Sequence, residues 1–391
     1  MIARVAAGGT TIFTTMTALA QATGAINLGQ GYPDFDGPPA LIEAAVSSLR
    51  AGENQYAQLA GVPALRAAIA AHQLRRYGLR FDADSEIQVT FGATEALASA
   101  LLALVTAGDE VAMLDPSYDS YGPIVALAGG RAVPIVLEPP GWRVDGAALE
   151  RAITTQTRVV IINSPHNPTG RVFERSELEL IAAACREHDL IALTDEVYEH
   201  LVYDGEHIPL ATLPGMASRT ITVSSIGKTH SVTGWKIGWA CGPRELIARL
   251  RAVKQYLTFA GGTPLQHATA VALGFPDSVA AELADALRAK RDRLAGGLRA
   301  AGFDVFDSAG TYFLNADATP LGEGDAEALC ARLPHEAGVA AIPMSALTAN
   351  GEGRTRSLLR FAFCKRDEVL DDAIGRLNAW AERSAIPSPA R

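Results

Sequence analysis

The sequence lacks the features that mark several large classes of protein. No run of lysine and arginine stands out, and the formal net charge is -9, which argues against a dedicated nucleic-acid or anionic-membrane surface. No stretch approaches the ~18 apolar residues of a membrane span, and residues 1–20 lack a continuous apolar core. We therefore expect a cytoplasmic protein that binds small molecules and other protein chains, and neither nucleic acid nor membrane.

Cysteine is also scarce. The four cysteines are far apart in the sequence and show no CxxC or Cys/His ligand spacing; they are Cys185, Cys241, Cys330 and Cys364. We expect buried thiols in a reducing compartment and no metal site.

What is present predicts an α/β fold. Apolar runs alternate with helical patterns, as expected for strands buried on both faces and linked by crossover helices in a mainly parallel sheet. Seven strands are predicted, at 87–91, 110–114, 132–137, 158–163, 190–195, 220–225 and 237–241.

The pattern changes after Gly274. A long charged helix is predicted over 277–302, followed by short strands at 311–315 and 357–363. At 391 residues the chain exceeds the roughly 250–300 at which one core stops growing, so two domains are expected. The predicted large domain spans 36–273, and a smaller α+β domain combines 1–35 with 274–391.

A glycine turn between a strand and a helix is a candidate phosphate site. In VTFGATEAL, Gly92 permits a tight turn, so that the backbone N–H groups near Ala93 and the Thr94 hydroxyl could hold a phosphate. An equal alternative is that Gly92 only separates the strand from the helix and has no role in ligand binding. The turn is not a Walker loop, and no GxGxxG follows a strand, so nothing indicates nucleotide binding.

Polar residues end two of the buried strands. Asn167 lies in the rigid turn NSPHNPTG, at an edge where open α/β sheets bind ligands, and its amide could donate to a ligand oxygen. Asp195 ends an apolar strand, where a poorly hydrated carboxylate needs a partner such as a protonated ring nitrogen. Tyr198 could reach the same ligand. A plain loop for the turn and a helix cap for Asp195 are the alternatives.

A lysine and an arginine complete the candidate site. Lys228 follows the strand TITVSS, and desolvation would lower its pKa and free the amine to form a Schiff base with an aldehyde. Ser225 and Lys236 could bind a phosphate on that aldehyde. In SLLRFAFCK, Arg360 alternates away from the aromatic face, beside small neighbours, where it can hold a carboxylate in a bidentate pair. An exposed lysine and a structural ion pair are the alternatives.

In this order along one chain, the motifs resemble the class I pyridoxal-phosphate aminotransferases of fold type I. The resemblance runs from INLGQGYPDF (26–35) to LLRFAFCK (358–365). The motifs NPTG, DEVY and SSIGKTHSVTGWKIGW are together highly specific. Within the family the sequence most resembles bacterial methionine aminotransferases and the kynurenine and glutamine transaminases, through NLGQGYPDFDGP, NQYAQLAGVPALR, DPSYDSY and GVAAIP.

The resemblance implies pyridoxal 5'-phosphate as cofactor and a role for each matching residue. Lys228 would hold the cofactor as an internal aldimine and move the proton, and Asp195 would pair with the pyridine nitrogen. Tyr198 and Asn167 would bond the phenolic oxygen. The other implied contacts are stacking by Tyr118, phosphate binding by Ala93, Thr94, Ser225 and Lys236, and substrate carboxylate binding by Arg360 and Asn167 with the Gly29 backbone nearby.

The resemblance also implies a homodimer that shares its sites, because Tyr56 matches a tyrosine that reaches the phosphate of the neighbouring subunit. The implied reaction is ping-pong transfer of an amino group from an L-amino acid to a 2-oxo acid. Tyr32, Tyr56 and Tyr118 suggest an aromatic-lined pocket for methionine, glutamine or aromatic side chains, with methionine as the first choice. No second arginine for a dicarboxylic substrate is apparent, and residues 348–357 match no motif of the family.

Two other functions stay open at this point. A cysteine-conjugate or cystathionine β-lyase uses the same scaffold, and the motifs do not separate it from a transaminase. A cofactor-sensing regulator of DNA binding is a remote alternative, because the aminotransferase motifs begin by residue 27 and the chain is acidic.

Overall fold

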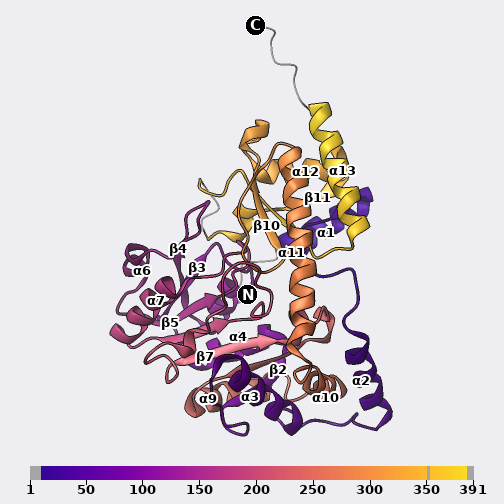
Figure 1. Cartoon of the computed structure of the whole chain (residues 1–391). Helices are drawn as coiled ribbons and strands as arrows, with labels where there is room; N and C mark the ends of the chain where they lie inside the picture. Colours follow the sequence, from indigo (N-terminus) through magenta and orange to yellow (C-terminus); the bar gives the residue numbers. More distant parts are fainter. Residues whose placement is uncertain (1–9, 350–352, 385–391) are drawn as a thin grey trace.

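The structure is a computed structural model that describes residues 10–349 and 353–384 (Figure 1). Its centre is a seven-stranded sheet in the order β2-β8-β7-β6-β5-β3-β4, mainly parallel, with β8 antiparallel to both of its neighbours. The strands are β2 (Ile87–Phe91), β3 (Glu110–Asp115), β4 (Arg131–Val136), β5 (Thr157–Asn163), β6 (Ile191–Asp195), β7 (Thr220–Ser225) and β8 (Ile237–Cys241). The predicted sheet is confirmed, with each strand end within one residue.

The side chains of β5 show why these strands are continuously apolar. Val159 and Ile161 belong to a core formed with helices α4, α5 and α9, whereas Val160 and Ile162 belong to a core formed with α6 and α7. Successive side chains of a strand point to opposite faces, so a strand covered on both faces needs apolar residues at every position.

Helices connect the strands and cover the sheet. The helix α7 begins with a capping box, in which Glu174 and Glu177 each accept a hydrogen bond from the other's backbone N–H. The helices of this part are α2 (Pro39–Arg50), α3 (Pro63–Tyr77), α4 (Gly92–Leu104), α5 (Tyr121–Ala128), α6 (Gly146–Ala152), α7 (Arg175–Glu187), α8 (Ile226–Thr229), α9 (Arg244–Leu257) and α10 (Thr263–Ala272).

The long helix α11 (Asp277–Ala300) extends from the seven-stranded sheet to a second, antiparallel sheet (Figure 1). That sheet has the order β12-β13-β10-β9, and a short parallel pair joins β1 to β11. The remaining elements are α1 (Ile12–Thr23), β1 (Ile26–Asn27), β9 (Asp304–Val305), β10 (Phe313–Asp317), α12 (Ala326–Glu336), β11 (Val339–Ala340), β12 (Ile342–Pro343), β13 (Leu358–Ala362) and α13 (Asp367–Ser384).

The sequence prediction for this part is correct in element type and shifted at some ends. The strand predicted to start at 311 starts at Phe313, because Thr311 has a φ of 65° and cannot continue a strand. The predicted helix ends at Ala300, ahead of Gly302 with its φ of 93°. The domain boundaries stay a prediction.

Backbone contacts bring the N-terminal segment to the second sheet. Leu28 donates from its backbone N–H to Ala340 of β11 and accepts from Ala362 of β13, so that the segment after β1 connects these two strands. None of the described helices is long and apolar enough to cross a membrane.

Candidate active site

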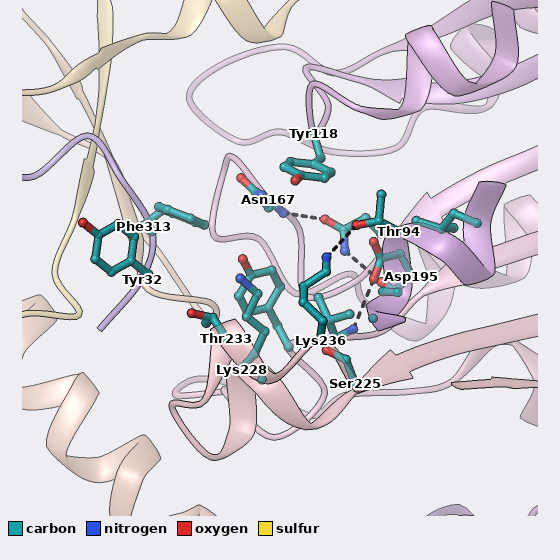
Figure 2. A pocket seen from close by; sticks show the side chains of 18 of the residues that line it. Tyr32, Thr94, Tyr118, Asn167, Asp195, Ser225, Lys228, Thr233, Lys236 and Phe313 are labelled. Atoms are coloured by element: carbon teal, nitrogen blue, oxygen red, sulfur yellow. Dashed lines mark hydrogen bonds between the residues drawn. The ribbon is translucent and has the colours of Figure 1, made fainter. Parts of the chain in front are cut away.

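A cavity of about 320 Å³ lies where the carboxyl ends of β5, β6 and β7 meet the start of α4 and the strand β13 (Figure 2). Residues far apart in the sequence converge there because parallel strands end at one edge of a sheet. The predicted site residues that line it are Tyr32, Ala93, Thr94, Tyr118, Asn167, Asp195, Tyr198, Ser225, Lys228, Lys236 and Arg360.

Two predicted residues lie outside the cavity lining. Gly29 does not line the cavity, and its carbonyl oxygen accepts a hydrogen bond from Arg360 at 2.9 Å. The side chain of Tyr56 is 80% exposed and meets the Phe259 ring edge to face at 5.6 Å. A single chain therefore does not bring Tyr56 to its own cavity.

One end of the cavity is built to hold an anion. Gly92 has a φ of 67° and begins α4, and Lys236 Nζ lies 3.4 Å from the Thr94 hydroxyl oxygen. A Cβ on Gly92 would come within 3.1 Å of that amine, and a Cβ on Gly238 would come within 2.7 Å of the Ala93 nitrogen. The N-terminus of a helix faced by an ammonium group suits a phosphate. A glycine that only separated the strand from the helix would not require this arrangement.

Asp195 is a buried carboxylate at the end of β6. The Tyr121 hydroxyl donates to its Oδ2 at 2.7 Å, and the Val197 backbone N–H donates to its Oδ1 at 3.3 Å. The second bond closes a local turn, and because no helix begins between β6 and Leu210, the helix-cap alternative is wrong. Burial raises the pKa of Asp195 to about 6, although the Tyr121 hydrogen bond opposes that shift. A positively charged ligand would restore full ionisation.

Lys228 is half-buried on the short helix α8, and its amine points into the cavity (Figure 2). Its Nζ lies 5.7 Å from the centre of the Tyr198 ring and 5.6 Å from that of Tyr312. Burial lowers the pKa of Lys228 to about 8. The alternative of an ordinary exposed lysine is therefore wrong, and a useful fraction of the amine is neutral near pH 7.

Arg360 is 1% exposed and faces the cavity from β13. It donates to the Asn167 side-chain oxygen and to the Gly29 carbonyl, each at 2.9 Å. Burial lowers its pKa to about 10. Both hydrogen-bond partners are neutral, and none of the ion pairs among the described residues includes this arginine. The alternative that Arg360 forms a structural ion pair is therefore wrong. A buried cation without a counter-ion is a site for an anionic ligand.

The expectation of small neighbours around Arg360 is wrong. Its guanidinium lies 4.0 Å from the centre of the Phe313 ring and 5.1 Å from that of Phe13. Alternation along β13 describes that strand only, whereas Phe13 and Phe313 come from α1 and β10. The aromatic rings limit the access of water to the guanidinium, and their faces attract its positive charge. These contacts fix the direction in which its N–H groups point.

Sequence reasoning did not single out several residues of the site. Tyr121 follows Tyr118 by three residues in DPSYDSY, and that helical spacing was the available signal. Asn163 donates to the Asp195 carbonyl and accepts from the Asn167 backbone N–H, both at 2.7 Å, and thus ties the two strand ends together. For Phe13 and Phe313 the sequence offered no signal.

Comparison with known proteins assigns this arrangement to a family. The family described as "Aminotransferase class I and II" matches residues 23–377. This chain belongs to that family. It is a pyridoxal-phosphate-dependent aminotransferase with the fold type I architecture, as the resemblance implied.

Relatives of this aminotransferase are named for different substrates. It is 52% identical to a probable N-succinyldiaminopimelate aminotransferase of Mycobacterium tuberculosis, over 98% of this chain and 99% of the other. It is 44% identical to the methionine aminotransferase of Escherichia coli, over 94% and 95%. The solved N-succinyldiaminopimelate aminotransferase of Mycobacterium tuberculosis superposes with a TM-score of 0.94 at 52% identity, covering 97% of this chain and 100% of that one.

The cavity of the aminotransferase fits its cofactor. The turn at Gly92 with Lys236 suits the phosphate, and the Asp195 carboxylate suits a protonated ring nitrogen. Lys228 lines the same cavity and offers an amine with a lowered pKa. Because Arg360 already occupies the Asn167 oxygen, the amide nitrogen of Asn167 remains to donate to the ligand.

Proposed function

We propose that this aminotransferase takes its amino group from an L-amino acid with a neutral side chain, methionine before glutamine or the aromatic and kynurenine type. It passes the group to a 2-oxo acid by a ping-pong mechanism. The observation that carries the proposal is the charge inventory of the cavity. Its cationic side chains are Lys228, Lys236 and Arg360, and each has a task in the common chemistry.

The residues divide that chemistry among them. Arg360 binds the α-carboxylate of the donor, and the Asn167 and Gly29 oxygens orient its fork. Lys228 Nζ removes the proton from the donor Cα, for which its lowered pKa is suited. Bound pyridoxal phosphate supplies the aldehyde that takes up the amino group and the ring that accepts electrons from Cα. Asp195 holds the ring nitrogen protonated.

The space for the donor side chain is apolar and aromatic. Tyr32, Phe13 and Phe313 line the cavity together with Arg360, and Tyr118 lines it from the loop between β3 and α5. Flat apolar walls suit a thioether or an aromatic ring, and sulfur makes favourable contacts with ring edges. The relation to the methionine aminotransferase of Escherichia coli supports this choice.

N-succinyldiaminopimelate is the second candidate donor, and the 52% identical relative favours it. Its distal carboxylates would need cations beyond the cavity lining. Arg354 is outside that lining and is paired with Asp115, the last residue of β3, three residues before Tyr118. Part of the neighbouring segment, residues 350–352, lies outside the described residues.

We propose a homodimer as the working unit. Tyr56 and Phe259 form an exposed aromatic pair, 80% and 43% exposed, which association with a second chain would cover. In this assembly Tyr56 serves the phosphate of the neighbouring subunit. Sedimentation of the holoenzyme tests this, and a monomer with full activity would contradict it.

A half-reaction spectrum separates the candidates. The holoenzyme is mixed with methionine, glutamine, kynurenine or N-succinyldiaminopimelate, each without a 2-oxo acid, and conversion of the cofactor to its amine form is followed by absorption. The proposal expects the fastest conversion with methionine. Fastest conversion with N-succinyldiaminopimelate would select the second donor. The β-lyase is tested in a further sample with cystathionine or a cysteine conjugate, whose sulfur leaves from Cβ; release of pyruvate and ammonia there, in place of conversion, would instead select the β-lyase.

A further inference from the structure

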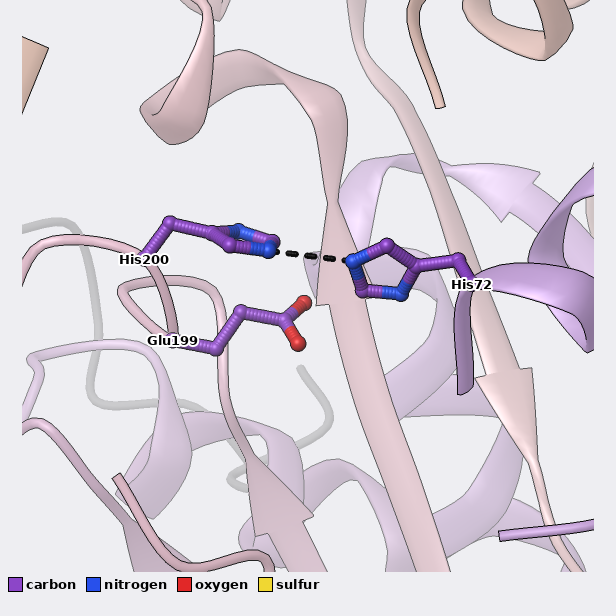
Figure 3. A group of neighbouring side chains, drawn as sticks. All are labelled: His72, Glu199 and His200. Atoms are coloured by element: carbon purple, nitrogen blue, oxygen red, sulfur yellow. Dashed lines mark hydrogen bonds between the residues drawn. The ribbon is translucent and has the colours of Figure 1, made fainter. Parts of the chain in front are cut away.

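A cluster of two histidines and a glutamate lies outside the catalytic cavity (Figure 3). His72 comes from α3, and Glu199 and His200 come from the turn after β6. The two Nε2 atoms are 3.0 Å apart, and the ligand atoms of all three side chains lie within 4.8 Å of one another. His72 and Glu199 are buried, and His200 is half-buried.

Glu199 is a buried carboxylate whose hydroxyl donors, among the described residues, are uncharged. Its carboxylate accepts hydrogen bonds from the Tyr77 hydroxyl at 2.6 Å and from the Ser224 hydroxyl at 2.5 Å, both neutral donors. Among the described residues, no lysine or arginine forms an ion pair with it. Burying an anion without a cation is costly, so a positive ligand would stabilise this arrangement.

The histidines are in the state that binds metal ions. Burial lowers the pKa of His200 to about 4 and also lowers the pKa of His72, so both imidazoles are neutral near pH 7. Two neutral imidazoles and a carboxylate form a ligand set typical of zinc.

We propose that His72, Glu199 and His200 bind a divalent transition-metal ion of the zinc type. Two nitrogens on one tetrahedral zinc lie roughly 3.3 Å apart at the usual bond lengths, close to the separation of these Nε2 atoms. The Glu199 carboxylate supplies the third ligand from its present position. His200 Nδ1 lies 3.0 Å from the Thr229 hydroxyl oxygen, the kind of outer contact that fixes a metal-binding imidazole.

A second cavity, of about 30 Å³, gives the ion and a bound water a place. His72, Glu199, His200 and Thr229 line it together with Arg75 and Asp277, whose carboxylate is about half exposed and pairs with Arg76 at 3.1 Å. The three ligands do not line the catalytic cavity. Ser224, which donates to Glu199, lies just before the helix α8 that carries Lys228, and Thr229, which contacts His200, is the last residue of that helix. The ion would therefore stabilise the position of α8.

The test measures metal content and affinity without measuring activity. The holoenzyme is stripped with a chelator, incubated with Zn²⁺ or Co²⁺, desalted and analysed for metal, and Co²⁺ is followed by its visible spectrum. We expect one ion per chain, a Co²⁺ spectrum of nitrogen and oxygen ligands, and a higher unfolding temperature. Thr229→Val should weaken binding about 10- to 100-fold, because it removes the outer contact of His200.

His72→Gln and Glu199→Gln should each abolish stoichiometric binding. The matched control is His267→Gln, which removes a half-buried histidine 3.4 Å from Glu53; this pair belongs to no three-ligand cluster in the part of the chain that the structure describes, and the variant should bind as the wild type does. Failure of the wild type to hold an ion after desalting would overturn the proposal. So would stoichiometric binding that persists in the folded His72→Gln variant, since that metal would lie elsewhere.

Discussion

The Tyr121 hydroxyl donates to Asp195 Oδ2 at 2.7 Å, joining the first residue of α5 to the last residue of β6. The Tyr121 ring also meets the Tyr118 ring edge to face at 5.7 Å. One buried tyrosine thus holds both the carboxylate proposed for the cofactor nitrogen and the ring proposed to stack on the cofactor. Its effect on the site comes through these two neighbours.

Tyr121→Phe should shift the pH at which the cofactor binds. In the cofactor-free protein, burial raises the pKa of Asp195 to about 6 and the Tyr121 bond opposes that rise, so its loss raises the pKa further. Affinity for pyridoxal phosphate falls as Asp195 gains a proton, and this fall should occur at higher pH in the variant. Binding titrations across pH 5–8 measure it, with Tyr256→Phe, which is 84% exposed, as the control. Superimposable curves for both variants would contradict the assignment.

Lys228→Ala should abolish transamination in a protein that still folds. The change removes the amine that captures the cofactor and the group that moves the proton, and general acid–base catalysis alone contributes about 10²- to 10⁴-fold. Single-turnover spectra with methionine, together with circular dichroism, provide the measurement. Substantial turnover by this variant would exclude Lys228 as the base.

Capture of pyridoxal phosphate by the cofactor-free protein should depend on pH with a midpoint near the pKa of Lys228. Burial lowers that pKa to about 8, and only the neutral amine attacks an aldehyde, so the rate rises with pH through about 8 and levels above it. Stopped-flow absorption between pH 6 and 10 gives the curve. A free lysine derivative, with a pKa of about 10.4, is the reference. A protein curve that follows this reference would show that Lys228 is not desolvated.

Arg360→Lys should lower kcat/KM for every donor by roughly 10²-fold or more, because an ammonium group cannot replace the bidentate fork. The variant would also lose one of the two bonds to Asn167 and Gly29 that set its direction. Steady-state kinetics with methionine measures the loss. Arg356→Lys, at a largely exposed arginine that pairs with Asp325, is the control and should remain near wild type. Equal effects of the two changes would argue against a substrate carboxylate at Arg360.

Two glycines of one motif should respond differently to alanine. A Cβ on Gly238 would lie 2.5 Å from the Gly92 carbonyl carbon, so Gly238→Ala must displace the start of α4. A Cβ on Gly234 would meet no atom within 4 Å. We expect Gly238→Ala to lower both the unfolding temperature and the affinity for pyridoxal phosphate, and Gly234→Ala to leave both unchanged. Equal affinities in the two variants would show that the phosphate does not depend on the start of α4.

The seven strands were predictable because each is an apolar run bounded by polar turns, and the buried β5 shows that both faces select such residues. Asn167, Asp195 and Lys228 were predictable because each follows such a run, and parallel strands end at one edge. Arg360 was predictable as a candidate. The prediction of its neighbours was wrong, because contacts between β13, β10 and α1 cannot be inferred from the periodicity of any one segment.

The order of strands and polar residues along the chain determined the fold class, the edge that carries the site and the family resemblance. These properties are local, because alternation and turn chemistry act over a few residues. Only the tertiary structure decided that Tyr121 holds Asp195, that Phe313 faces Arg360, and that His72 meets His200 across 128 positions of sequence. Such pairs form through packing between distant elements, where shape and burial select partners that spacing does not record.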